Sequence, residues 1–259
     1  MRYSPDTDII IPRGIENEVA IAMVVAHIQR TLDEKSRLHR AGLKKLGLTM
    51  ADEPISKNVL LIPQTPQVVG MATIIQDRDT SREDFIFYFD RLSTLLVESA
   101  MNNMRFTDAT VTTPLGLPYH GLHHVGEVSA VVILRSGATL ETGLRRVIPD
   151  CRTGRLLIQS NYRTGEPELH YQHLPSDIAT HDGVLLLGPE MLSGGAALMA
   201  VKVLVDHGVA EPNIVFVTYF ATKAGLNRLC KVFPEIKVVA CRVIDEHEER
   251  WIATKYFGC

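Results

Sequence analysis

The run from Val184 to His207 constrains the fold more than any other part of the chain, because three kinds of local structure follow one another within it. Val184 to Leu187 is a short apolar run typical of a strand, Ser193-Gly194-Gly195 is a turn of small residues, and Ala196 to His207 has the apolar spacing of a helix. A strand that leads through such a turn into a helix leaves backbone N–H groups free at the start of the helix, where a phosphate group can bind. The run therefore predicts a phosphate-binding turn.

Strand patterns alternate with helix patterns along the rest of the chain. The predicted strands are Val59–Ile62, Val68–Ile75, Ala109–Thr112, Val128–Leu134, Arg155–Ser160, Val184–Leu187, Ile214–Phe220 and Lys237–Cys241, with a hairpin through Arg163 to Pro167. The predicted helices are Thr139–Val147, Ala196–His207, Lys223–Val232 and one that Thr80 caps, with Phe85, Phe89, Leu92, Leu95, Leu96 and Ala100 facing inward. This alternation indicates an α/β fold with a parallel, doubly wound sheet and helices on both faces. Ligands of such sheets bind beyond the carboxyl ends of the strands, where Arg135 and Ser193 both lie.

Composition narrows the classes of partner. The 259 residues include 46% hydrophobic and 22% charged residues, and the net charge of −3 gives no electrostatic reason to bind nucleic acid or an anionic membrane. No apolar run approaches the roughly 20 residues that span a bilayer, and the first residues lack the apolar core of a secretory signal. The four cysteines are widely spaced, which is typical of reduced thiols and of neither a disulfide framework nor a zinc site. We therefore expect a cytoplasmic protein with no metal site.

Two stretches resemble known families. Asp8 to Leu32 resembles the last part of a uridine kinase domain, and the chain from about Pro66 onward resembles the uracil phosphoribosyltransferase domain that follows this kinase in uridine-cytidine kinase-like proteins. The motifs that carry the second resemblance are Thr80–Tyr88, Ile133–Gly137, Leu157–Gln159, Thr164–Tyr171 and Lys255–Gly258. The resemblance implies a type I phosphoribosyltransferase fold, a parallel twisted sheet with a small hood or hairpin. It also implies a kinase remnant at 1–46 and a transferase-like domain at 47–259. The sequence contains no G-x-x-x-x-G-K-[ST] phosphate loop, so we do not expect this chain alone to phosphorylate uridine.

The resemblance also implies a ligand and its contacts. A working member of the family joins uracil to the ribose of phosphoribosyl pyrophosphate (PRPP), usually with magnesium, and forms UMP and pyrophosphate. Arg135 matches the pyrophosphate-contacting arginine of the family, and Gly137 belongs to the same motif. Ser193, Gly194, Gly195 and Ala196 occupy the loop that holds the 5′-phosphate. These residues are the candidate binding residues for PRPP with magnesium, if the site survives.

Three elements of the family site are missing. The first acid of the phosphate loop falls on Gly188, a second arginine falls on Ser160, and residues 244–254 replace the Pro-Gly loop that holds uracil. Each lost hydrogen bond to a polar base costs about 1–3 kcal/mol. These departures predict a catalytically degenerate protein with no catalytic residues, which acts as a regulatory or assembly subunit in pyrimidine salvage.

A competing hypothesis is an active transferase for uracil or a related base, with a remodelled site. Glu190, Arg163 and Trp251 would then replace the missing groups. The structural alternatives are a solvent-facing Glu190, a solvated Arg163 and a Trp251 that fills a packing gap. His123 and His124 are predicted to be loop residues, and the acidic run after Ile244 a solvated surface.

The resemblance finally implies self-association. Members of the family form dimers or tetramers, so we expect a homo-oligomer, or a mixed oligomer with an active pyrimidine-salvage enzyme. A phosphorylated nucleotide is a further possible ligand, and a structural partner that binds no nucleotide is a third hypothesis.

Overall fold

The computed structural model describes residues 21–22, 25, 54–161, 166–244 and 250–258. The chain divides into two units, Met1–Lys45 and Leu46–Cys259, and the fold below is that of the second unit. Apart from residues 21–22 and 25, the predicted kinase remnant at 1–46 lies outside the described residues, as do Arg163 and the acidic run at 245–249. Those predictions stay untested.

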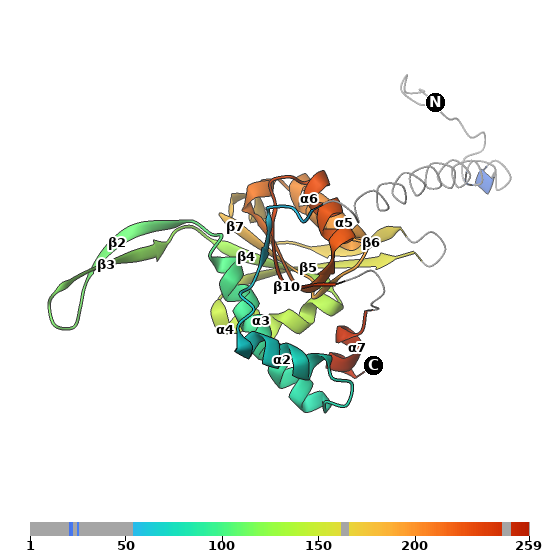
Figure 1. The fold of residues 1–259 in the computed structure, drawn as a ribbon. Coiled ribbons are helices and arrows are strands. Elements are labelled where there is room, and N and C mark those ends of the chain that lie inside the picture. Colours follow the sequence, from blue (N-terminus) through green and yellow to red (C-terminus); the bar gives the residue numbers. More distant parts are fainter. Residues whose placement is uncertain (1–20, 23–24, 26–53, 162–165, 245–249, 259) are drawn as a thin grey trace, which may run out of the picture. The chain divides into compact units, whose positions relative to one another are not determined.

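A mainly parallel sheet forms the centre of this unit (Figure 1). Its strands are β1 (Val59–Leu61), β4 (Val128–Leu134), β5 (Arg152–Ser160), β6 (Pro167–His173), β7 (Gly183–Leu187), β8 (Glu190–Met191), β9 (Ile214–Thr222) and β10 (Lys237–Ile244). Among the described residues the strand order is β1-β10-β9-β7-β4-β5-β6, with β8 beside β9, and only the β5–β6 pair is antiparallel. The strands β4, β7 and β9 are almost wholly buried, as their continuous apolar sequences require of strands covered on both faces.

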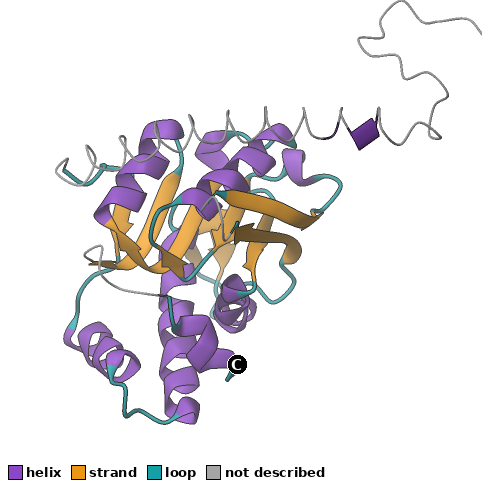
Figure 2. Cartoon of the chain, turned by 90° about the vertical axis from the view of Figure 1, so that its right-hand side faces the viewer, coloured by secondary structure: helices purple, strands orange, loops and turns teal. Residues whose placement is uncertain are grey.

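Helices cover both faces of the sheet (Figure 2). They are α2 (Pro66–Gln76), α3 (Arg82–Met101), α4 (Glu141–Val147), α5 (Gly195–Asp206), α6 (Lys223–Val232) and α7 (Ile252–Phe257), with 3₁₀ turns η2 (Ser136–Leu140), η3 (Ile178–Thr180) and η4 (Glu211–Asn213). One core cluster joins α2, α3, α4 and α7 to one face, and a second joins α5 and α6 to the other. The mainly parallel sheet between helices confirms the predicted fold class.

A separate two-stranded hairpin projects from this body (Figure 1). It consists of β2 (Phe106–Thr112) and β3 (Pro118–His124), paired antiparallel from Phe106–His124 to Thr112–Pro118. His123 and His124 therefore lie in a strand, and their assignment to a loop was wrong.

The strand predicted at Val68–Ile75 is instead the centre of α2. Thr65 caps this helix by accepting a hydrogen bond from the N–H of Val68, and proline occupies its first position. The buried residues Val68, Met71, Ala72 and Ile75 have the three- and four-residue spacing of one helix face. A short apolar run is ambiguous between strand and helix, and here the start signal at Thr65 decides.

Two smaller predictions about α3 were also wrong. The cap is Ser81, one residue after Thr80, and its hydroxyl accepts from the N–H of Asp84. Leu95 is 40% exposed, whereas Phe85 and Phe89 are fully buried as predicted. No helix in the described part of the chain is long and apolar enough to cross a membrane.

Candidate functional site

Parallel strands bring the predicted binding residues to one edge of the sheet. Arg135 directly follows β4, and the loop from Gly188 to Gly195 follows β7. Since β4 and β7 are neighbours and run parallel, their carboxyl ends meet. The structure thus brings Arg135 and the predicted phosphate loop to the same edge.

The segment after β4 approaches β7 closely. Arg135 is exposed and precedes η2, and the peptide bond between Leu134 and Arg135 is cis. Gly137 is buried, and a Cβ atom there would lie 2.4 Å from the carbonyl oxygen of Leu187. Only glycine fits this approach, so Gly137 positions the segment and its side-chain position is closed to a ligand.

The phosphate turn, residues Ser193 to Ala196, has the geometry that its sequence predicted. Gly194 adopts a left-handed conformation (φ 74°), and α5 begins at Gly195. The first N–H groups of a helix have no acceptor within the helix, and the Ser193 hydroxyl reaches the N–H of Gly195 only at 3.5 Å. Backbone donors and the positive end of the helix dipole therefore converge on the turn.

Groups from β9 and α6 hold the phosphate turn in place. The Thr222 hydroxyl donates to the carbonyl oxygen of Leu192 (2.6 Å) and accepts from the N–H of Gly225 (3.0 Å). Arg228 donates to the carbonyl oxygen of Ser193 (2.9 Å), and burial lowers the pKa of its guanidinium. These contacts hold the turn through the carbonyl oxygens of Leu192 and Ser193. They do not use the N–H groups at the start of α5.

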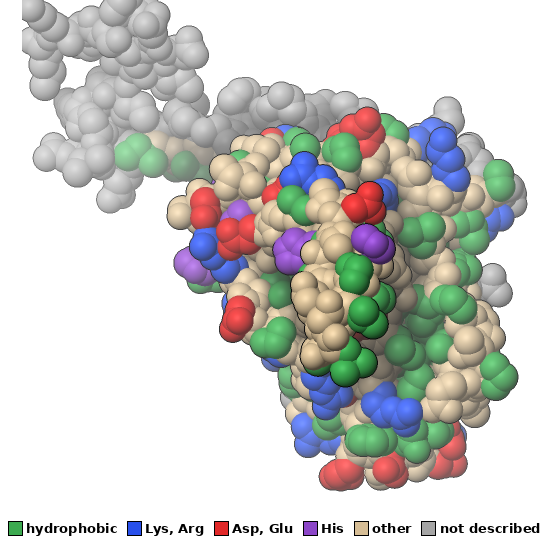
Figure 3. Space-filling model, turned by 90° about the vertical axis from the view of Figure 1, so that its left-hand side faces the viewer, with side chains coloured by type: hydrophobic (Ala, Val, Ile, Leu, Met, Phe, Trp, Pro, Cys, Tyr) green, Lys and Arg blue, Asp and Glu red, His purple; other side chains and the backbone are tan. Residues whose placement is uncertain are grey.

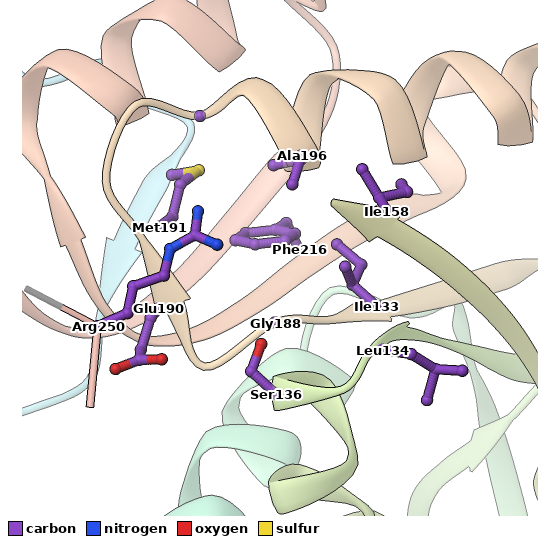
Figure 4. Close-up of a pocket in the computed structure, with 12 residues that line it drawn as sticks. Ile133, Leu134, Ser136, Ile158, Gly188, Glu190, Met191, Ala196, Phe216 and Arg250 are labelled. Atoms are coloured by element: carbon purple, nitrogen blue, oxygen red, sulfur yellow. The ribbon is translucent and has the colours of Figure 1, made fainter. Parts of the chain in front are cut away.

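A small cavity lies beside the turn (Figure 4). Its volume is about 40 Å³. The residues that line it are mostly apolar: Ile133, Leu134, Ser136, Ile158, Gly188, Glu190, Met191, Gly194, Ala196, Ala197, Phe216 and Arg250. A Cβ atom on Gly188 would lie 3.2 and 3.3 Å from two carbons of the Phe216 ring. The aromatic ring thus crowds the space that a larger residue at position 188 would need.

Glu190 does not face solvent, contrary to the sequence prediction. Its side chain is buried, and its Oε1 accepts hydrogen bonds from the N–H groups of Trp251 (2.7 Å) and Ile252 (2.9 Å). In Figure 4 its carboxylate points away from the Phe216 ring, whereas the guanidinium of Arg250 points toward Met191 and Phe216. Burial raises the pKa of Glu190, although the two N–H groups and Arg250 favour its charged form. Glu190 therefore binds the start of α7.

Trp251 is partly buried and packs against the hydrophobic core. Its ring contacts that of Phe85 at a centroid distance of 5.6 Å. The following helix α7 is anchored through Tyr256, whose hydroxyl donates to Asp90 at 2.8 Å. Burial raises the pKa of Asp90, while the Tyr256 hydroxyl and Arg146 lower it. Residues 250–258 thus form a packed C-terminal segment, which we call the C-terminal anchor.

A second cavity of about 530 Å³ lies between the end of α2 and this anchor. Its lining includes Gln76, Asp77, Arg250, Trp251 and Lys255. Lys255 donates to the carbonyl oxygen of Asp77 at 3.0 Å. No residue of the phosphate turn lines this cavity.

The sequence reasoning missed the groups that support the site. Thr222, Gly225 and Arg228 hold the turn. Phe216 lies beside Gly188 in the adjoining small cavity. A threonine at the junction of a strand and a helix is a recognisable cap, and Thr222 indeed accepts from Gly225. The contacts of Phe216 and Arg228 depend on tertiary packing and leave no local sequence signal. Ser160, where the family has an arginine, is exposed at the end of β5.

Comparisons with known proteins agree with this geometry. The family model for uracil phosphoribosyltransferase matches residues 62–254. The chain is 42% identical over 237 residues to uridine-cytidine kinase-like 1 of Mus musculus, covering 91% of this chain and 42% of that protein. It is 40% identical over 198 residues to the uracil phosphoribosyltransferase of Dictyostelium discoideum, covering 76% of this chain and 91% of that enzyme.

The kinase-like relatives are longer than this chain, which spans 42% of the mouse protein and 54% of the uridine kinase of Saccharomyces cerevisiae. Among solved structures, the AQ2163 protein of Aquifex aeolicus superposes with a TM-score of 0.66 at 22% identity, over 77% of this chain and 97% of that one. That likeness supports the fold, and the sequence matches identify the relationship. The chain belongs to the uracil phosphoribosyltransferase family.

Proposed function

We propose that the protein is a catalytically degenerate uracil phosphoribosyltransferase-like subunit that retains a phosphate-binding turn. The observation that carries this proposal is the crowding at Gly188. Two carbons of the Phe216 ring lie 3.2 and 3.3 Å from where a Cβ atom on residue 188 would be, which is tighter than an ordinary van der Waals contact, and the adjoining cavity is about 40 Å³. Pockets for small molecules usually measure about 300–1,000 Å³. The space for ribose beside the turn is therefore largely filled.

Two of the three groups that would compensate for the missing elements, Glu190 and Trp251, have other contacts, and the third, Arg163, lies outside the described residues. Glu190 binds the start of α7, and Trp251 packs on Phe85. Magnesium in such a site needs carboxylate or phosphate oxygens. Gly188 offers none, and the Oε1 of Glu190 already accepts two N–H groups. The residues beside the turn do not fit a magnesium ion on their own.

The phosphate turn supports a residual ligand site. Its backbone donors depend on main-chain geometry, which Thr222 and Arg228 maintain. The exposed Arg135 supplies a cation at the same edge. A phosphate ester or pyrophosphate is the ligand class that backbone N–H groups and an arginine recognise.

The projecting hairpin supports a role in assembly. Its exposed apolar side chains are Val111, Leu115, Leu117, Tyr119 and Leu122, and Leu115 is 87% exposed. Figure 3 views the molecule from the hairpin side and shows hydrophobic side chains on this face. Val111 and Tyr119 are paired across the two strands, and Leu115 and Leu117 lie in the turn that joins the strands. Exposed apolar side chains gathered in this way are typical of a protein contact. We propose a second copy of the chain, or an active pyrimidine-salvage enzyme, as the partner.

A turnover assay tests the loss of catalysis. Labelled uracil, PRPP and magnesium are incubated with the purified chain, with an active uracil phosphoribosyltransferase as the positive control. We expect no UMP above the protein-free blank. Formation of UMP that increases with protein concentration would overturn the proposal and favour an active, remodelled transferase.

Calorimetric titration tests the residual site. PRPP, UMP, UTP and uracil are each titrated in the presence of magnesium. We expect the phosphorylated ligands to bind and uracil to give no heat. Arg135→Ala should weaken binding about tenfold, since hydrogen bonds to charged groups contribute about 1.5–3 kcal/mol. Arg105→Ala is the matched control, because Arg105 pairs with Asp182 away from the turn. No binding of any phosphorylated ligand would leave a purely structural subunit.

Sedimentation tests the proposed assembly. We expect the wild-type chain to self-associate, or to co-sediment with an active uracil phosphoribosyltransferase. Leu115→Glu and Leu122→Glu should each reduce association, because both place a charge on the apolar hairpin. Leu60→Glu is the control, since Leu60 is 42% exposed on the distant edge strand β1. Unchanged association in the hairpin variants would exclude this surface.

A further inference from the structure

A cluster of ionisable side chains lies at the amino edge of the sheet, opposite to the phosphate turn. Glu127 precedes β4, Arg152 begins β5, and His181 lies just before β7. Asp177 precedes η3, which ends one residue before His181. Because β7, β4 and β5 are adjacent and parallel, their starts meet at this edge. We call these four residues the His181 cluster.

The imidazole of His181 is the unusual member. Its side chain is 1% exposed, and neither ring nitrogen has a hydrogen-bond partner among the described residues. A buried polar group without a hydrogen-bond partner destabilises the folded state. Its Nε2 points at two carboxylates, at 3.5 Å from Asp177 Oδ1 and 3.8 Å from Glu127 Oε2. Both distances exceed the range of about 2.7–3.2 Å of an N–H···O hydrogen bond.

The 3.5 Å separation of His181 Nε2 from Asp177 Oδ1 matches that of two ligands of one metal ion, and the 3.8 Å separation from Glu127 Oε2 is slightly longer. Ligand atoms that each lie about 2.0–2.2 Å from a tetrahedral ion are separated by about 3.3–3.6 Å. All three ligand atoms of Glu127, Asp177 and His181 lie within 4.8 Å of one another. Glu127 and Asp177 are about half exposed, so an ion can enter from solvent.

Arg152 leaves the required oxygens available. It pairs with Oε1 of Glu127 at 2.9 Å and with Oδ2 of Asp177 at 2.6 Å. The other oxygen of each carboxylate faces His181. Arg152 thus orients both carboxylates in the way that outer-shell groups orient metal ligands. The two carboxylates and the single guanidinium of Arg152 together carry a net charge of −1, which attracts a cation.

We propose that Glu127, Asp177 and His181 form a binding site for a divalent transition metal, with Zn²⁺ as the best match. One imidazole nitrogen and two carboxylate oxygens are ligands that zinc accepts. Three protein ligands leave one coordination position for water or an external donor. The site joins the starts of β4 and β7 and is separate from the phosphate turn, so it does not depend on the proposed function.

Zinc titration of the full chain against a chromophoric chelator tests this site. We expect one Zn²⁺ per chain with an affinity that falls at least tenfold in Glu127→Gln and in Asp177→Asn. Both substitutions keep side-chain size at partly exposed positions, so the variants should fold. Glu168→Gln is the matched control, because Glu168 lies 3.8 Å from the exposed His170 outside the cluster. It should bind zinc like the wild type.

Cobalt supplies a second readout that does not depend on activity. Co²⁺ bound to nitrogen and oxygen ligands should give a visible absorption band that Zn²⁺ displaces, and Asp177→Asn should weaken it. The proposal is overturned if the chain binds no zinc at micromolar concentration. It is equally overturned if binding is the same in Glu127→Gln, Asp177→Asn and the Glu168→Gln control.

Discussion

The phosphate turn and the Gly188 side of the same small cavity differ in the groups that they present, which are backbone N–H donors at the turn and side chains beside Gly188. At the turn, the donors are backbone N–H groups at the start of α5, held by Thr222 and Arg228. On the Gly188 side, the Phe216 ring lies close to the position of a side chain on residue 188, and Glu190 binds the start of α7. The first region offers backbone donors, and the second is made of closely packed, mostly buried side chains.

This difference follows from the way each part recognises its ligand. A backbone donor remains when its side chain is replaced, as Ala196 illustrates at the position of the family's serine. A ribose or base is recognised by particular side chains and loops, so single replacements remove the contact. We therefore expect phosphate binding to be lost later than base binding when such a site degenerates. The predictions below challenge this division, beginning with the largest effect.

Gly225→Ala should damage the phosphate turn most. A Cβ atom there would lie 2.3 Å from the carbonyl oxygen of Leu192, so the turn must move. Overpacking of this kind costs about 1–3 kcal/mol, and we expect about 3 kcal/mol because backbone is the obstacle. Urea unfolding measures the loss, and calorimetry should show that phosphate ligands no longer bind.

Gly195→Ala is the control within the turn. Its Cβ atom would contact Pro167 at 3.6 Å, an ordinary van der Waals distance. Stability and phosphate binding should both be retained. If Gly225→Ala is tolerated as well as Gly195→Ala, the turn is not held as we infer.

Glu190→Ala should detach the C-terminal anchor. The N–H groups of Trp251 and Ile252 lose their acceptor, which costs about 2 kcal/mol. Amide hydrogen exchange should increase in α7, while phosphate binding at the turn stays unchanged. Loss of phosphate binding in this variant would mean that Glu190 serves the ligand site after all.

Glu190 also gives the anchor a dependence on pH. Burial raises its pKa above the ordinary value of 4.5, so the folded state favours the protonated acid. The stabilisation from this acid is complete below its unfolded pKa and is lost as the pH rises through the folded pKa. Unfolding of the wild type and of Glu190→Gln is compared at pH 4.5 and pH 7. The wild type should lose stability relative to Glu190→Gln as the pH rises, and the opposite sign would contradict the burial argument.

Gly188→Asp tests whether a carboxylate can be restored beside the phosphate turn, where the Phe216 ring now lies close to residue 188. The new Cβ atom meets the Phe216 ring at 3.2 Å, so the variant should lose about 1.5 kcal/mol and gain no affinity for PRPP. Phe216→Leu with Gly188→Asp should recover part of this loss, because neighbouring substitutions couple by about 0.5–3 kcal/mol. The double variant should bind PRPP more tightly when magnesium is present. Gly188→Asn with Phe216→Leu controls for charge, and equal binding by both double variants would exclude a role for the carboxylate.

The elements that sequence alone predicted are those with a strong local signal. The buried strand Val128–Leu134 and the helix Lys223–Val232 have the bounds that their patterns indicated. Both follow from apolar periodicity, which burial imposes directly. The hairpin strand Pro118–His124 has exposed residues on both sides, so no apolar alternation marks it.

The candidate site divides in the same way. The turn at Ser193 to Ala196 was predictable because a strand, a small-residue turn and a helix follow one another. The contacts of Glu190 with Trp251 and Ile252 join positions 61 and 62 residues apart. The sequence around Glu190 contains no pattern that predicts them. The same holds for Phe216 beside Gly188, since a buried strand residue has many possible neighbours.

Tyr256→Phe should have the smallest effect and sharpens the account of the C-terminal segment. The Tyr256 hydroxyl donates to the buried Asp90 at 2.8 Å, and its loss should cost about 1 kcal/mol. Tyr171→Phe is the control, because Tyr171 is 50% exposed on β6 and should leave stability unchanged. If Tyr256→Phe destabilises the fold but leaves phosphate binding intact, the anchor and the turn are independent. A loss of ligand affinity without a loss of stability would instead show that the segment before Gly258 contacts the ligand. The C-terminal anchor and the phosphate turn would then not be independent regions.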